Sequence, residues 1–188
     1  MFGIPVHPAQ EAERIGWDLD KVLGAWIECA RLTPWEAWLE PTPSRGRSAL
    51  DLGINSFVPI TLLPEAWRNR VFPWGTLEWP PPQGAIAYEE ELNVRCRKLD
   101  ALLEFVEPIR SEWSMFLQEE SDALRSAPDR EIEMARGSPI SYPRLLEMQR
   151  IHAAQHYRQV ATYFSSTGRP IPGFRPEQLN FALPDRIY

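Results

Sequence analysis

Apolar residues recur at spacings of three and four along most of this chain, which is the pattern of amphipathic helices. The pattern is clearest in three stretches, at residues 8–32, 88–117 and 143–168. A fourth stretch, SALDLGINSFV, begins at Ser48, a residue type that caps helix N-termini. The alternating apolar pattern of β-strands is almost absent. The sequence therefore predicts an all-α fold, a four-helix bundle with long proline-rich connections.

Prolines mark the expected helix boundaries, because proline removes a backbone donor and clashes with the preceding turn. We expect a kink or break near Pro59, a new helical turn from Pro64, and a bend or split at Pro108. Thr33 and Glu36 have the spacing of a capping box, which predicts a short helix capped by Thr33.

The length of 188 residues suits one domain and is short for two. We predict a single domain over residues 1–188, with the proline-rich extension at 169–188 packed on the bundle. The stretch EESDALRSAPDREIEMARGSP is predicted to be a polar loop with some helical turns. The stretch FPWGTLEWPPPQG is predicted to be an irregular connection.

Charge and composition exclude several classes of partner. A formal net charge of -6 argues against a nucleic-acid binder, which needs a basic face. No apolar run is long enough to span a membrane, and the N-terminus lacks the pattern of a secretory signal. Cys29 and Cys96 have no C-x-x-C spacing, which indicates reduced thiols in a cytoplasmic protein; a reactive Cys29 is the alternative. We expect a small-molecule substrate and neither a nucleic-acid nor a membrane partner.

Two of the three histidines lie four residues apart in the stretch MQRIHAAQHYRQVATYF. On a helix, His152 and His156 share one face, and Gln159 continues it. Three interpretations are open: ordinary helix residues satisfied by neighbours or water, a metal site, or a catalytic pair. The zincin pattern H-E-x-x-H does not fit, because Ala153 occupies the position of its glutamate. A metal site would need a ligand from another helix.

The segment HAAQHYRQVATYFSSTG resembles the last-helix motif of the DinB-like (YfiT-like) superfamily, which is unrelated to the polymerase of that name. The segment RSALDLGINSF is similar to its second-helix segment, and the ending LPDRIY is similar to the tail of some members. The resemblance covers nearly the whole chain. It implies a four-helix bundle, often a homodimer, that holds nickel or zinc on three histidines. It also implies a thiol-dependent S-transferase or isomerase that uses mycothiol, bacillithiol or glutathione.

This chain departs from the family pattern at the first metal histidine, whose position is held by Asn55. An amide oxygen is a poorer ligand for nickel or zinc than an imidazole is. The resemblance therefore implies a degenerate metal site on His152, His156 and Asn55. Gln159 would line the same pocket.

Four other residues have alternative interpretations. Asp51 is one turn before Asn55 and is either a further ligand or a first-turn acid favoured by the helix dipole. His7 is a ligand only if the start of the first helix reaches the site. Glu147 is on another helix face and is expected to be solvated. Arg158 either pairs with an acid of a neighbouring helix, which we favour, or binds a ligand carboxylate.

Two functions from different classes are consistent with these residues. The first is a thiol-dependent enzyme, in which a bound cation ionises the thiol or a histidine acts as its general base. The second is a metal-free, non-catalytic protein of the same fold that binds a small molecule or forms a dimeric interaction module. Asn55 is the sequence feature that favours the second.

Overall fold

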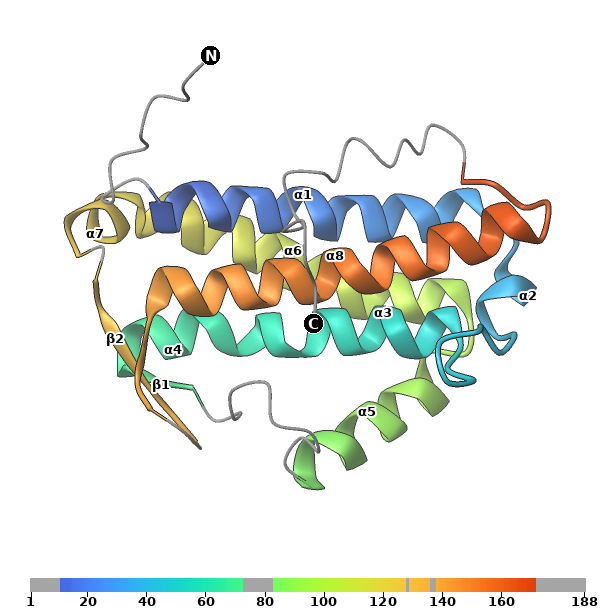
Figure 1. The fold of residues 1–188 in the computed structure, drawn as a ribbon, viewed down its shortest axis with the longest axis horizontal. Helices are drawn as coiled ribbons and strands as arrows, with labels where there is room; N and C mark the ends of the chain where they lie inside the picture. Colours follow the sequence, from blue (N-terminus) through green and yellow to red (C-terminus); the bar gives the residue numbers. More distant parts are fainter. Residues whose placement is uncertain (1–10, 73–82, 128, 136–137, 172–188) are drawn as a thin grey trace, which may run out of the picture.

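The computed structural model describes residues 11–72, 83–127, 129–135 and 138–171 (Figure 1). Most of these residues are helical. The helices, in chain order, are α1 (Glu11–Leu32), α2 (Trp35–Trp38), α3 (Ala49–Phe57), the 3-10 helix η2 (Val58–Leu62), α4 (Leu63–Asn69), α5 (Gln83–Arg95), α6 (Leu99–Glu119), α7 (Ser121–Ser126) and α8 (Tyr142–Ser166). The strands are β1 (Val71–Phe72), β2 (Glu131–Met134) and β3 (Ile140–Ser141).

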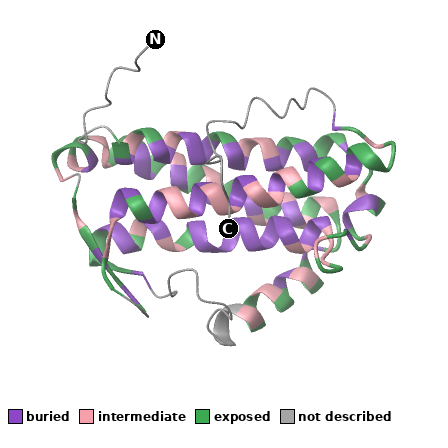
Figure 2. Ribbon diagram, viewed as in Figure 1, coloured by how far each residue is buried: buried purple, intermediate pink, exposed green. Residues whose placement is uncertain are grey.

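The long helices lie along the long axis of the molecule. Figure 1 shows α1, α6, α8 and the run from α3 through η2 to α4 side by side, with α5 extending obliquely beneath α3. Contacts join α1 to α6 and α8, and α3 to α8 and α5. The buried faces of these helices point toward one another (Figure 2). Trp26 of α1 and Trp113 of α6, each 1% exposed, fill the space between them.

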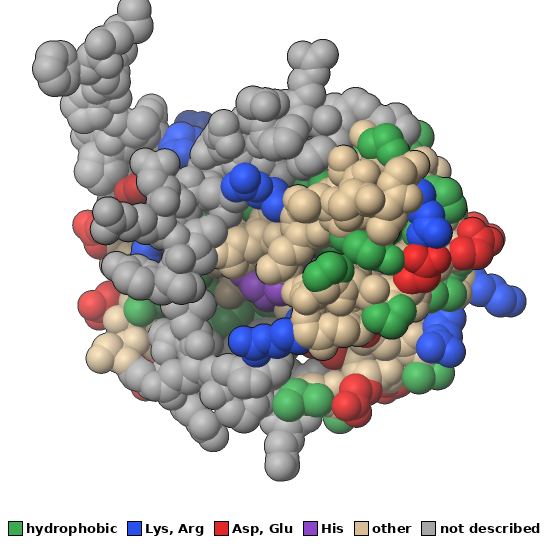
Figure 3. Space-filling view, turned by 45° about the vertical axis from the view of Figure 1, so that its right-hand side comes forward, with side chains coloured by type: hydrophobic (Ala, Val, Ile, Leu, Met, Phe, Trp, Pro, Cys, Tyr) green, Lys and Arg blue, Asp and Glu red, His purple; other side chains and the backbone are tan. Residues whose placement is uncertain are grey.

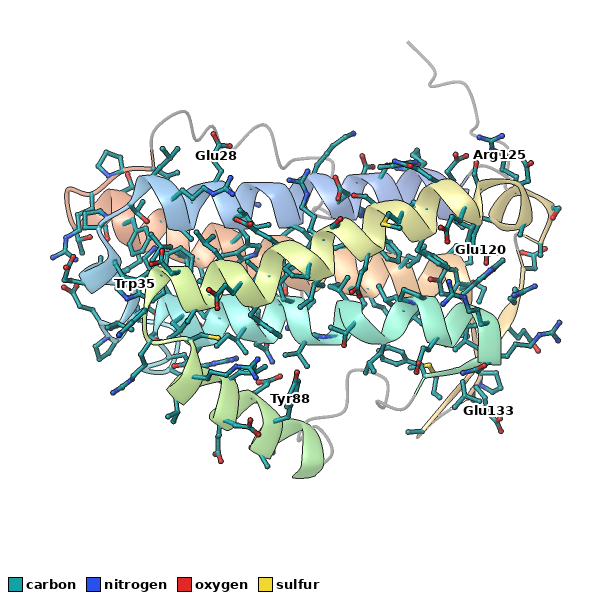
Figure 4. All side chains as sticks on the ribbon, turned by 180° about the vertical axis from the view of Figure 1, so that it is seen from behind. Glu28, Trp35, Tyr88, Glu120, Arg125 and Glu133 are labelled. Atoms are coloured by element: carbon teal, nitrogen blue, oxygen red, sulfur yellow. The ribbon has the colours of Figure 1, made fainter. Side chains whose placement is uncertain are left out.

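Salt bridges and hydrogen bonds close one end of this arrangement. Arg125 of α7 donates to both carboxylate oxygens of Glu13 on α1, at 2.7 and 2.9 Å. Glu120 accepts a hydrogen bond from Nε1 of Trp67 on α4. Figure 4 shows Glu120 and Arg125 together at the end of the molecule where α6 meets α7. These contacts tie α7 to α1, and the junction of α6 and α7 to α4.

The predicted polar loop at 119–139 contains a strand, so that part of the prediction was wrong. In β2, exposed and buried residues alternate, with Ile132 and Met134 turned inward. β2 pairs with β1 in parallel and with β3 antiparallel, giving the order β1-β2-β3. Four residues are too short an alternation to detect among charged neighbours, and both partner strands are only two residues long.

The predicted third helix is two helices, and the break is not at Pro108. The chain leaves helical geometry at Lys98, which is extended with φ −119° and ψ 146°. α6 then continues through Pro108, which is exposed. The carbonyl one turn before Pro108, which loses its helical donor, belongs to exposed Glu104, and water can satisfy it there.

Other boundaries agree with the sequence. Ser48 caps α3, and its backbone amide donates to Asp51 in a reciprocal capping box. The α-helix gives way to the 3-10 helix η2 at Val58, next to Pro59, near which a break was predicted, and Pro64 lies in the first turn of α4. α8 ends before Gly168, whose φ of +75° suits the glycine expected there.

Thr33 is not the cap that its sequence neighbours predict. α2 begins at Trp35 after Pro34, without a side-chain cap. The Thr33 hydroxyl instead donates to the carbonyl of Cys29 and accepts from Nε1 of Trp38. The end of α1 and a buried indole therefore occupy the oxygen that a capping box would need.

Several expectations concern residues outside the described ranges: His7, most of the FPWGTLEWPPPQG connection, and the extension from residue 172 onward. None of the helices in the described ranges combines the length and apolar character needed to cross a membrane. Cys29 is fully buried, and burial raises the pKa of its thiol to about 12, which disfavours the reactive thiolate.

Candidate functional site

His152 and His156 lie on the face of α8 that contacts α3. Their ring centroids are 4.6 Å apart, and both side chains are half-buried. Buried residues on the other faces of the same turns, Ala153 and Tyr157 among them, pack α8 against the core. Trp26 of α1 donates a hydrogen bond to the Ala153 carbonyl. The packing of α8 therefore fixes the direction in which both imidazoles point.

The two imidazoles meet one amide oxygen. Oδ1 of Asn55 lies 3.0 Å from Nε2 of His152 and 3.1 Å from Nε2 of His156. Asn55 is in the middle of α3 and is 7% exposed. The sequence prediction placed these three side chains at one point, and the structure brings them together there.

Glu89 of α5 determines which way the Asn55 amide faces. Nδ2 of Asn55 donates to Oε1 of Glu89 at 2.8 Å, which leaves Oδ1 toward the histidines. Burial raises the pKa of the Glu89 carboxyl, while the hydrogen bond from Asn55 and the positive charge of Arg47 oppose that rise. A carboxylate here is an acceptor only, so it holds the amide in one orientation.

Gln159 lies beside the pair, as predicted. Its Oε1 is 3.0 Å from Nδ1 of His156 and accepts a hydrogen bond from the Ser44 hydroxyl at 3.1 Å. Ser44 belongs to the loop between α2 and α3. The outer nitrogen of His156 is therefore held by a side chain of its own helix, which is in turn held by that loop.

Both imidazoles are neutral near pH 7. Burial lowers the pKa of His152 to about 3, with further lowering from His156 and Arg47. Burial also lowers the pKa of His156, and Arg47 adds to this effect, while the hydrogen bond with Gln159 opposes it. A neutral imidazole has one N–H group and one nitrogen lone pair.

The position of the proton on His156 determines which of its nitrogens presents a lone pair to Asn55. With the Gln159 amide oxygen facing His156 and Ser44, Nδ1 of His156 is the nitrogen that donates to it. The lone pair on Nε2 of His156 then faces Oδ1 of Asn55 at 3.1 Å. Two acceptors repel at this distance unless a positive charge lies between them.

A divalent cation suits this position. Ligands bonded at about 2.1 Å are about 3.0 Å apart in octahedral coordination and about 3.4 Å apart in the tetrahedral coordination usual for zinc. The separations of 3.0 and 3.1 Å are closer to the octahedral value, and they are also the lengths of ordinary hydrogen bonds. Two imidazole nitrogens are good ligands for zinc or nickel, and the amide oxygen is a weak third. Within the described ranges, no cluster of three His, Cys, Asp or Glu residues is present that would hold a metal without Asn55.

The Asp51 carboxylate takes part in the N-terminal cap of α3. Its Oδ2 accepts from the backbone amide and the hydroxyl of Ser48, at 2.9 and 3.0 Å. This geometry supports the first-turn acid interpretation over the ligand interpretation. Glu147, expected to be solvated, is instead paired with Arg150, to which it is joined at 2.6 and 2.8 Å.

Positive side chains surround the site. Arg47 donates to the carbonyl of Asp51, and its charge reaches both histidines and Glu89. The ion pair favoured for Arg158 is absent among the described residues. Figure 3 shows a histidine at the bottom of a recess, with Lys or Arg side chains on two sides of it.

Glu89, Arg47 and Ser44 were not among the residues predicted for the site. Glu89 stands three residues before Leu92, which is fully buried, and this spacing places it at the edge of the buried stripe of α5. That signal is weak, because Glu90 and Glu91 follow directly and are exposed. Ser44 and Arg47 lie in a loop whose course the sequence did not define.

In comparisons with known proteins, no family model, curated protein or solved structure matches this chain. Its function has to be inferred from its own side chains.

Proposed function

We propose that the protein is a DinB-like four-helix-bundle enzyme that binds nickel or zinc at His152, His156 and Asn55. It acts with a low-molecular-weight thiol in S-transfer or isomerisation. The observation that carries this proposal is the approach of both Nε2 atoms to within 3.1 Å of one amide oxygen. The parallel course of α1, α6, α8 and the α3–α4 run supports the bundle.

Each side chain of the site has a defined part in this proposal. His152 and His156 are neutral near pH 7 and present ring nitrogens to the cation. Asn55 supplies the third donor, and Glu89 keeps its oxygen turned inward. Gln159 fixes the His156 ring through Nδ1, as the outer partners of metal-bound histidines commonly do.

His152, His156 and Asn55 would hold the cation, which would supply positive charge that lowers the pKa of a coordinated thiol. The chain itself favours the same outcome, because Arg47 is close enough to shift the pKa of both imidazoles and would stabilise a thiolate beside them. The thiolate would form an S–C bond to the electrophilic carbon of the substrate, and the leaving group would depart with the electrons of the bond that breaks, as chloride does from monochlorobimane. Burial is the main cause that keeps both imidazoles unprotonated, and the charge of Arg47 adds to it.

A transfer assay tests the proposal. Untagged protein loaded with zinc or nickel is incubated with glutathione, bacillithiol or mycothiol and the electrophile monochlorobimane. We expect metal-dependent conjugation with at least one thiol, reduced by about 100-fold in His156→Ala. Gln155→Ala, at the preceding half-buried position of α8, is the matched control and retains activity. Conjugation with none of the three thiols, or equal rates in His156→Ala, contradicts the enzyme.

A second function is favoured by the identity of residue 55. If both Nε2 atoms carry protons, one Asn55 oxygen accepts from both imidazoles, which a histidine at this position does not do. If the Gln159 amide is flipped so that its nitrogen faces His156, this nitrogen would then donate to Nδ1 of His156. This closed network describes a metal-free small-molecule binder or interaction module, and a metal-free protein after zinc loading supports it.

The proposal includes a homodimer in the cytoplasm that takes a small-molecule substrate and binds neither nucleic acid nor membrane. The net charge of -6 supports the exclusion of nucleic acid. Light scattering during size-exclusion chromatography tests the dimer, for which the measured mass is twice that of one chain.

A further inference from the structure

A groove of about 460 Å³ lies next to the histidine pair, on the side toward the C-terminal end of α8. It runs between α8 and the loop at residues 42–44. Its lining includes Pro43, Ser44, Arg158, Gln159, Thr162 and Tyr163. The volume is in the range of sites that hold small molecules.

The groove and the histidine site share two side chains. Ser44 and Gln159 line the groove, and they meet at Oε1 of Gln159, which also contacts Nδ1 of His156. Thr162 and Tyr163 are one helical turn further along α8, about 5–6 Å beyond Arg158 and Gln159. One end of the groove is therefore separated from His156 by the Gln159 side chain, and the groove extends away from it along the helix.

Arg158 lines this groove, and no described acid neutralises its charge. It forms no ion pair or hydrogen bond with another side chain in the described ranges. The acid near the groove, Glu40, is already occupied: it accepts from Tyr163 at 2.9 Å and from Arg169 at 2.7 Å. A guanidinium with free N–H groups binds a carboxylate through two parallel hydrogen bonds.

We propose that this groove binds a carboxylate-bearing low-molecular-weight thiol, with a carboxylate on Arg158 and the sulfur toward His156. This assignment rests on the proposed thiol-dependent function and narrows it. Glutathione, a tripeptide about 10 Å long when extended, has two carboxylates, and bacillithiol carries a malate group. Mycothiol carries sugar and inositol hydroxyls and no carboxylate. The groove therefore favours glutathione and bacillithiol over mycothiol.

Binding in the absence of metal tests the assignment. Isothermal titration calorimetry of the EDTA-treated full chain uses glutathione and glutathione diethyl ester, which keeps the thiol but lacks carboxylate charge. We expect the ester to bind at least ten-fold more weakly to the wild-type protein. In Arg158→Gln the two ligands bind equally, because the guanidinium that distinguishes them is gone. Arg144→Gln, an exposed position on the same helix, behaves as wild type.

The variant Thr162→Trp tests ligand binding in the groove in a second way, which does not depend on charge. Thr162 is exposed and lines the groove, so an indole there fills the space without disturbing the core, and glutathione binding is lost. Circular dichroism melting curves verify that each variant is folded. Absence of glutathione binding to the wild-type protein, or a ten-fold preference that persists in Arg158→Gln, overturns the assignment.

These outcomes separate the groove from the metal. If the zinc-loaded protein transfers thiols but Arg158→Gln leaves the glutathione preference intact, the groove assignment fails and the enzyme stands. If the protein binds no metal but binds glutathione through Arg158, the metal-dependent enzyme fails and the groove stands as a binding site.

Discussion

The Oδ1 atom of Asn55 lies 3.1 Å from Nε2 of His156, although the two residues are 101 positions apart in the chain. The contact crosses from α3 to α8, and His152 joins it from one turn earlier on α8. Only the packing of these two helices creates the cluster. Its chemistry therefore depends on the side chains that hold Asn55 and the rings in place.

Glu89 is predicted to be a positioning residue for Asn55, the proposed third metal ligand. Glu89→Leu removes the acceptor of Nδ2, so the amide is free to turn its oxygen away, and zinc affinity falls by about ten-fold. Glu89→Gln keeps an acceptor oxygen and retains most of the affinity. Competition with a chelating dye measures both variants.

The control for this prediction is Glu90→Leu, the adjacent exposed position of α5. Like Glu89→Leu, this variant replaces an acid of α5 with leucine and changes the net charge by the same amount. Residue 90, however, does not contact Asn55. Equal zinc affinity in all three variants and in the wild-type protein would remove Glu89 from the site.

Asp51 is predicted to stabilise the fold without binding metal. Asp51→Ala removes the acceptor of the Ser48 amide and the favourable charge at the start of α3, which lowers the free energy of unfolding by about 1 kcal/mol. Urea denaturation measures this loss, and exposed Asp129→Ala is the control. Zinc affinity is unchanged. A ten-fold drop in affinity would show instead that Asp51 is a ligand.

The placement of His152 and His156 on one helix face could be predicted from the sequence, because it depends only on their spacing in the chain. Spacing of four residues puts His152 and His156 on one face of any helix, whatever surrounds it. The partner at position 55 came from the resemblance of the second-helix segment. The proline break at Pro59 and the Ser48 cap are also local, and the structure has both.

What the sequence did not reveal depends on contacts between distant segments. Glu89 belongs to the site only because α5 crosses α3, and nothing in the run Glu89–Glu91 distinguishes the first acid from its neighbours. The strand β2 exists because β1 and β3 pair with it. The helix α6 continues through Pro108, where a split was predicted. A helix tolerates proline where the carbonyl that loses its hydrogen bond faces water.

Acid is predicted to destabilise the metal-free protein through His152. The pKa of this imidazole is about 3 in the folded protein and about 6.5 in the unfolded chain. Between these values the unfolded chain binds a proton that the folded protein does not, so stability is lost as pH falls from about 6.5 toward 3. The loss reaches up to about 1.4 kcal/mol per pH unit.

Urea denaturation at pH 7 and pH 5 in EDTA isolates this group when the wild-type protein is compared with His152→Gln. Glutamine does not titrate, so the variant loses less stability between the two pH values than the wild-type protein does. A wild-type-to-variant difference that is the same at both pH values would contradict a half-buried, neutral imidazole at position 152.

The close approach of α1 and α6 predicts contrasting effects of two glycine substitutions. A Cβ at Gly16 would lie 2.5 Å from Cδ2 of Leu117, which is fully buried, so Gly16→Ala costs about 1–3 kcal/mol. A Cβ at Gly24 would meet the end of the Arg110 side chain at 2.8 Å, which can move. Its gain in helix propensity, about 1 kcal/mol, offsets that shift.

Thermal and urea unfolding of both variants measures the contrast. Gly16→Ala as stable as the wild-type protein would mean that the two helices are further apart than described. A large loss in Gly24→Ala would mean that Arg110 is held rigidly by Asp20.

Asn55→His is predicted to strengthen metal binding. A third imidazole at this position replaces the weak amide oxygen, and zinc affinity rises by ten-fold or more. Asn69→His, at an exposed position at the end of α4, adds the same group elsewhere and leaves the affinity unchanged. Competition titration with a zinc chelator compares the three proteins, and a loss of affinity in Asn55→His would show that the site has no room for a ring.

The most direct measurement is the nickel and zinc content of the untagged protein by elemental analysis after loading and removal of free metal. With two imidazoles and one amide oxygen as the ligand set, the content is close to one ion per chain, and it falls to background in the His152→Ala, His156→Ala double variant. A wild-type content at background, or equal content in both proteins, would contradict a metal site at these residues.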